Sequence, residues 1–118
     1  MKIAIVGSRS INADIPDDII PDNATKIYSG AATGIDIAAR RYAIKHNILI
    51  IEILPEYELY GRIAPLKRND IIIKLADVVY IFWDGKSRGT GYVINKCKET
   101  GKPYHLFEYT DGEFKEIT

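Results

Sequence analysis

The chain has 118 residues, which fits one domain spanning residues 1–118 with a core that needs neither metal nor disulfide. Apolar residues make up 47% and charged residues 27%, as in ordinary soluble globular domains. Sixteen basic residues balance sixteen acidic ones, which argues against an extended nucleic-acid interface but allows a small basic pocket.

The sequence contains no pattern typical of export or membrane insertion. Met1 leads directly into an apolar strand pattern, without the order of charges expected of a signal peptide. The longest apolar run, residues 48–54, is too short to cross a bilayer. We therefore expect a cytoplasmic protein with no membrane partner, in which the single cysteine, Cys97, is buried and structural.

The first predicted strand, residues 2–6, is a continuous β-branched run, as in parallel strands covered on both faces. Gly7-Ser8-Arg9 follows, where a glycine allows the backbone to turn close to a ligand. The alternative is a plain surface turn with a solvated arginine. Residues 12–23 are acidic and interrupted by prolines, so we expect a turn of helix at most and assign them no chemistry.

The second predicted strand, residues 26–28, leads into Ser29-Gly30-Ala31-Ala32-Thr33-Gly34. A small-residue turn between strand and helix aims backbone N–H groups and a helix dipole at an anion, usually a phosphate. Thr33 and Asp36 also fit a Thr-x-x-Asp capping box, which would coexist with a ligand contact. The predicted helix places its apolar residues on one face: Ile35, Ala38, Ala39, Tyr42 and Ala43.

Residues 48–54 form the third predicted strand, and a loop over residues 55–63 follows. Tyr57 and Tyr60 favour two interpretations of that loop: a lid whose rings stack on a base, or a loop packed by its own aromatic rings. The next predicted helix spans residues 64–76, with Pro65 near its first position.

Arg62, Lys67 and Arg68 crowd the start of this helix, where the helix dipole disfavours cations. An anion bound among them would offset that conflict. The alternative is that their aliphatic stems cover apolar surface.

Residues 78–83 form the fourth predicted strand. A second glycine-rich turn, residues 84–91, joins it to a helix over residues 90–100. The fifth strand covers residues 104–109, and Asp111-Gly112 predicts a hairpin to an edge strand over residues 113–117.

Alternation of strands and helices predicts a three-layer α/β domain with a mostly parallel five-stranded sheet and a C-terminal hairpin edge strand. Ligands bind such sheets beyond the carboxyl ends of the strands, where all three glycine-containing turns would meet. No metal-ligand spacing is visible and no cofactor is required. Asp36 and Asp84 are weak catalytic candidates without a paired acid or base, so enzymatic activity is left open.

Four motifs occur in the order and spacing of the SLOG superfamily of Rossmann-like nucleotide-binding domains: Gly7-Ser8-Arg9, residues 29–36, Arg68-Asn69, and residues 84–90. The chain most resembles the small single-domain YspA-like branch. DNA-processing protein A and the cytokinin-activating phosphoribohydrolases are more distant relatives. The resemblance implies a Rossmann-like fold and a pocket for a nucleotide-derived ligand above the strand ends.

Carried over by motif, the resemblance implies a set of ligand-binding residues: Gly7, Ser8, Arg9, Ser29, Gly30, Ala31, Thr33, Gly34, Asp36, Arg68, Asn69, Asp84, Ser87, Gly89 and Thr90. One departure matters. The phosphoribohydrolases carry a glutamate that works at the ribose, whereas Val93 stands at that position here. Their hydrolytic reaction is therefore not carried over.

We expect a nucleotide-binding domain whose partner is a small phosphate-bearing ligand, with sensing as its role. A hydrolase that cleaves an N-glycosidic or phosphate bond of a nucleotide is the first alternative, with Asp36 or Asp84 as its carboxylate. Single-stranded DNA binding is the second, weakened by the neutral charge. Symmetric dimers are common among such domains, so a homodimer stands beside the monomer as an open alternative.

Overall fold

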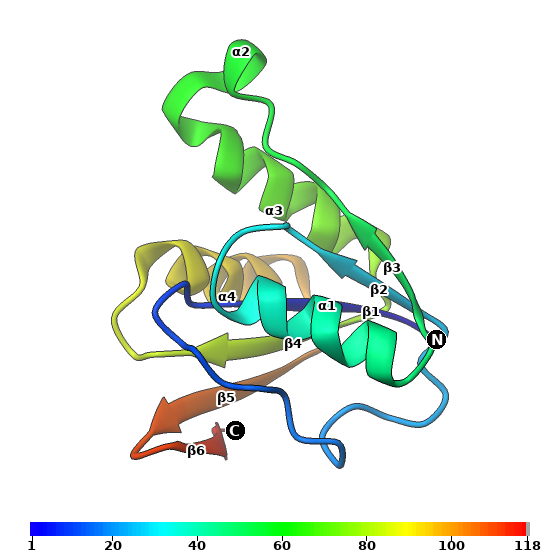
Figure 1. Cartoon of the computed structure of the whole chain (residues 1–118). Coiled ribbons are helices and arrows are strands. Elements are labelled where there is room, and N and C mark those ends of the chain that lie inside the picture. Colours follow the sequence, from blue (N-terminus) through cyan, green and yellow to red (C-terminus); the bar gives the residue numbers. More distant parts are fainter. Residues whose placement is uncertain (118) are drawn as a thin grey trace.

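The computed structural model describes residues 1–117 and shows one six-stranded sheet in the order β3-β2-β1-β4-β5-β6, with helices on both faces (Figure 1). Its strands are β1 (Lys2–Gly7), β2 (Lys26–Ser29), β3 (Leu49–Glu52), β4 (Val78–Trp83), β5 (Tyr104–Thr110) and β6 (Glu113–Ile117). Its helices are α1 (Ile35–Lys45), α2 (Tyr57–Tyr60), the 3₁₀ helix η1 (Gly61–Ile63), α3 (Ala64–Leu75) and α4 (Arg88–Thr100).

Five strands are parallel, and β6 pairs antiparallel with β5 at one edge. This confirms the predicted parallel sheet with a C-terminal hairpin strand. The chain leaves β1 toward β2 but returns from β3 to the other side of β1, at β4. The strand order therefore reverses between β1 and β4, and their carboxyl ends flank the position where open α/β sheets bind ligands.

Alternating side chains of β1 enter two hydrophobic cores. Ile3 and Ile5 face the core that contains α1, while Ala4 and Val6 face the core that contains α3 and α4. The connection between β1 and β2 has no helix, yet it covers the first core with Ile11, Ile15 and Ile20. Both faces of β1 are thus covered, as its continuous apolar sequence predicts.

The thiol of Cys97 is buried on α4 in the second core. Burial raises its pKa to about 11, against which the nearby Lys102 ammonium acts only weakly. The expectation of a buried structural cysteine is confirmed.

Two predicted boundaries and one interpretation are corrected. Strand β3 has only four residues, because it pairs solely with the four-residue β2. Helix α4 starts at Arg88 rather than residue 90, because Ser87 caps it. Residues 55–63 contain α2 and η1, in which no residue is buried, so this segment is not a loop packed by its own aromatic rings.

Candidate functional site

A cavity of about 430 Å³ lies at the carboxyl ends of β1 and β4, where the strand order reverses. It brings together the three glycine-containing turns and the start of α3. The lining residues expected from sequence are Gly7, Arg9, Asp36, Arg68, Asn69, Asp84, Ser87, Gly89 and Thr90. Segments as far apart in sequence as Gly7 and Thr90 thus meet where the fold favours a ligand.

A second cavity of about 410 Å³ adjoins the first and shares Arg9, Ala32 and Arg68 with it. Gly30, Ala31 and Thr33 line it from the turn before α1. Tyr57 of α2 and Arg40 of α1 line it as well. The two shared arginines therefore stand at the junction of two spaces, each of the size that small ligands occupy.

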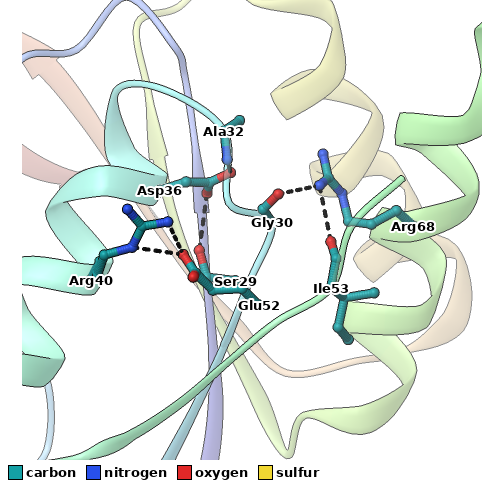
Figure 2. A network of polar contacts seen from close by, with 8 residues as sticks. All are labelled: Ser29, Gly30, Ala32, Asp36, Arg40, Glu52, Ile53 and Arg68. Carbon is teal, nitrogen blue, oxygen red and sulfur yellow. Dashed lines mark hydrogen bonds and ion pairs between the residues drawn. The ribbon is translucent and has the colours of Figure 1, made fainter. Parts of the chain in front are cut away.

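Arg68 is the most constrained side chain of the site (Figure 2). Its Nη1 donates to the carbonyl oxygens of Gly30, at 2.5 Å, and Ile53, at 3.2 Å. Its Nε donates to Oδ1 of Asn69 at 2.8 Å. The residue is only 6% exposed, and within residues 1–117 its Nη2 has no hydrogen-bond partner. One edge of the guanidinium is thus hydrogen-bonded within the protein, while Nη2 on the other edge is free.

The surroundings of Arg68 disfavour its positive charge. Burial lowers the pKa of the guanidinium, and repulsion from Arg9 adds to that effect, although the Asp36 carboxylate opposes it. No carboxylate among residues 1–117 forms an ion pair with Arg9 or Arg68. Two arginines that line the same cavities without an ion pair form a site that a bound anion would stabilise.

Gly30 fills the narrow gap between Arg68 and Asp36. A Cβ atom added there would lie 2.6 Å from Nη1 of Arg68 and 2.9 Å from Oδ2 of Asp36. Only a residue without a side chain allows both charged groups to pack against the same stretch of backbone.

The carboxylate of Asp36 accepts hydrogen bonds from the backbone N–H of Ala32, at 3.0 Å, and from Oγ of Ser29, at 3.3 Å. Burial raises its pKa, although these bonds and Arg68 act in the opposite direction. The predicted Thr33–Asp36 capping box is wrong, because Gly34 is the N-cap of α1 and no side chain caps it. The carboxylate instead closes the preceding turn, in which Ala31 adopts a φ of 57°.

The turns after β1 and β2 are in direct backbone contact through Gly34. Its φ is 70°, and a Cβ atom there would lie 2.5 Å from the carbonyl oxygen of Ser8. The same carbonyl accepts the N–H of Ile35 at 3.3 Å. Because glycine has no Cβ atom, the two turns can approach each other this closely.

Ser8 connects the ends of β1, β4 and α4 from inside the protein. It has no exposed surface, and its Oγ accepts the N–H of Asp84 at 3.0 Å and lies 3.4 Å from the hydroxyl oxygen of Thr90. Its own N–H donates to the carbonyl of Phe82 at 3.0 Å. The side chain therefore orders the turns that surround the first cavity.

Asp84 orders the turn before α4. Its Oδ1 accepts the N–H groups of Lys86, at 2.8 Å, and Ser87, at 2.7 Å, and its Oδ2 accepts Oγ of Ser10 at 2.5 Å. Burial opposes ionisation, but the hydrogen bonds outweigh it and lower the pKa to about 2. A carboxylate so firmly ionised and so fully hydrogen-bonded is a poor general base at neutral pH.

The N-terminus of α4 faces the first cavity through Gly89 and Thr90. Ser87 caps the helix by accepting the N–H of Thr90 on Oγ, at 3.5 Å. Within residues 1–117 the N–H of Gly89 has no partner. A free N–H at the positive end of a helix dipole suits an anionic group.

Three of the expected ligand-binding residues line neither cavity: Ser8, Ser29 and Gly34. Ser8 and Ser29 have no exposed surface and support the turns from behind. Ser10, Pro65 and Leu66 line the first cavity but were missed. Helical periodicity could have predicted Pro65 and Leu66. They precede Arg68 and Asn69 by three residues and therefore lie on the same face of α3.

Val93 also lines the first cavity, at the position where the phosphoribohydrolases carry their glutamate. It is 1% exposed and packs in the core of α3 and α4. Within residues 1–117, no three side chains of His, Cys, Asp or Glu cluster as a metal site would require.

No protein-family model and no curated protein matches the chain. A solved structure of DNA processing protein A (DprA) from Streptococcus pneumoniae has a similar fold, with a TM-score of 0.70 and 20% sequence identity. The alignment covers 94% of this chain and 52% of the DprA chain, so this chain spans about half of that protein. The fold is Rossmann-like, as expected. No helix within residues 1–117 has the length and apolarity to cross a membrane.

Proposed function

We propose that this domain binds a nucleotide or a nucleotide-derived ligand, with a phosphate held between Arg9 and Arg68. The observation that carries the proposal is the guanidinium of Arg68. Backbone carbonyls and Asn69 fix one of its edges, while Nη2 has no partner within residues 1–117. The exposed Arg9 lines the same two cavities as Arg68. A fixed guanidinium with a free edge suits the planar, multiple hydrogen bonding that phosphate oxygens accept.

The rest of the site fits a phosphate ester better than a free phosphate ion. The N–H of Gly89 supplies a further donor at the start of α4. The cavities on either side of the arginines, about 430 and 410 Å³, leave room for a nucleoside. Membership of the SLOG superfamily, and of its YspA-like branch, is part of this proposal; the motif order and the DprA-like fold support it.

Binding or sensing fits the site better than hydrolysis. Asp84 accepts the hydrogen bonds that order its turn, the carboxylate of Asp36 is hydrogen-bonded within the turn before α1, and Val93 is apolar. The hydrogen bonds that lower the pKa of Asp84 to about 2 make it a poor general base, and the side chain of Val93 cannot transfer a proton. Product analysis after long incubation tests the alternative, since a hydrolase would consume the bound nucleotide.

The fold similarity to a DNA-processing protein favours DNA as a second candidate ligand. The same arginines would then contact the backbone phosphates of a single strand. The balanced charge of the chain weighs against that reading, because single-strand binders usually present a positive groove.

Thermal denaturation with a ligand panel tests the proposed function. The panel contains adenine and guanine nucleotides, ADP-ribose, cyclic dinucleotides and a single-stranded oligonucleotide. A ligand at about a hundredfold its Kd adds about 2.7 kcal/mol to the free energy of unfolding. We expect a nucleotide to raise the Tm, and Arg9→Ala to reduce that rise. Arg41→Ala, which removes a surface arginine that pairs with Asp14, is the matched control and retains it. No rise with any phosphate compound would overturn the proposal, and a rise with the oligonucleotide alone would favour DNA.

A further inference from the structure

The segment from Leu54 to Ile63 projects beyond the sheet, with α2 at its tip (Figure 1). All residues from 56 to 63 are exposed, although five large apolar side chains lie in the segment. Leu54 and Leu59 are 66% and 65% exposed. Those five side chains, here called the projecting apolar surface, are Leu54, Tyr57, Leu59, Tyr60 and Ile63.

Helix α3, which follows this segment, carries two further exposed apolar side chains. Ile71 and Leu75 lie four residues apart, on one face of the helix. A helix of four residues with no buried side chain gains little stability from packing within its own chain. Contiguous exposed apolar side chains of this kind mark an interaction site.

Two acidic and two basic side chains lie beside the projecting apolar surface. Glu56 and Glu58 flank Tyr57, and Arg62 and Lys67 stand at the start of α3. Among residues 1–117 none of the four forms an ion pair. The surface therefore matches neither a strongly acidic partner, such as a nucleic acid or an anionic membrane, nor a strongly basic one.

We propose that the projecting apolar surface is the interface between two copies of this chain related by a twofold axis. In such an interface each patch meets its own equivalent, so acidic residues of one copy face basic residues of the other. The interface buries the apolar side chains and pairs the four charges in the same step. Since Tyr57 also lines the second cavity, the partner copy would border that cavity.

Sedimentation equilibrium over about two orders of magnitude in protein concentration tests this proposal. We expect a dimer that dissociates on dilution. Leu59→Glu and Ile63→Glu should shift the chain to a monomer. Ile44→Glu places the same charge at an apolar side chain that is 74% exposed on α1, away from this surface, and should leave the dimer intact.

Charge-reversal variants test whether two copies pair through these four charges, without any change to the apolar side chains. A variant with Glu56→Lys and Glu58→Lys, and another with Arg62→Glu and Lys67→Glu, should each be monomeric because like charges meet. An equal mixture should form a heterodimer. Circular dichroism checks that each variant is folded. A wild-type chain that is monomeric throughout the concentration range would overturn the proposal, as would dimers lost equally in the Ile44→Glu control.

Discussion

The guanidinium of Arg68 lies against the backbone of Gly30, with Nη1 donating to the Gly30 carbonyl at 2.5 Å. On the opposite side of Gly30 lies the carboxylate of Asp36. This arrangement joins α3 to the turn before α1 and presents the free edge of the arginine to the two cavities. Structure and proposed binding therefore depend on the same contact.

Replacing Gly30 with alanine should expel Arg68 from its position. The added Cβ atom would lie 2.6 Å from Nη1, closer than packed atoms allow. We expect the free energy of unfolding to fall by about 1–3 kcal/mol, measured by urea denaturation. Gly91→Ala is the control: its Cβ meets nothing within 4 Å, and alanine should stabilise α4 by about 0.5–1 kcal/mol. Equal effects of the two substitutions would contradict the packing described.

The two arginines should differ in what their removal changes. Arg9 is exposed and forms no ion pair within residues 1–117, so Arg9→Ala should change the free energy of unfolding by less than about 0.5 kcal/mol. Loss of a charge-assisted bond should weaken nucleotide affinity about 10- to 100-fold, measured by calorimetry. Arg68→Ala should lower both affinity and stability. Full affinity in Arg9→Ala would show that the phosphate lies elsewhere.

Some features of the fold and the site can be predicted from the sequence, and others cannot. The conflict between cations and the helix dipole at the start of α3 draws attention to Arg62, Lys67 and Arg68, of which only Arg68 lines the two cavities. Its partners are carbonyls of Gly30 and Ile53, 38 and 15 residues away, and no local pattern encodes them. The predicted capping box is wrong for the same reason. A local sequence rule places the Asp36 carboxylate at the start of α1, whereas in the folded protein it accepts the N–H of Ala32 in the preceding turn. Continuous apolar runs, by contrast, predict the parallel sheet well, because a strand buried on both faces is apolar at every position.

Asp84 should make the protein sensitive to acid. Its folded-state pKa, about 2, lies below its ordinary value of 3.8. Its contribution to stability is therefore fully present above about pH 4 and is lost as the pH falls through about 2. With allowance for solvent screening, Asp84→Asn should lower the free energy of unfolding by about 1–2 kcal/mol at pH 5, and by much less near pH 2.

Denaturation at both pH values measures this difference. Asp18→Asn is the control, since Asp18 is exposed and forms no hydrogen bond within residues 1–117. A gap between wild type and Asp84→Asn that is the same at both pH values would contradict a role for the ionised carboxylate.

Ser8 should act through stability rather than through ligand contact. Ser8→Ala leaves the N–H of Asp84 without its acceptor, and we expect a loss of about 1–2 kcal/mol in the free energy of unfolding. Ser10→Ala removes an exposed hydroxyl from the same network and should cost less. If Ser8→Ala instead abolished nucleotide binding at unchanged stability, Ser8 would have to contact the ligand directly.

A crystal structure with the nucleotide that raises the Tm most tests the central claim directly. We expect phosphate oxygens within about 3 Å of Arg9, of Nη2 of Arg68 and of the Gly89 N–H, with the nucleoside in one of the two adjoining cavities. A nucleotide bound away from these groups, or a site that contains none at saturating concentration, would contradict it.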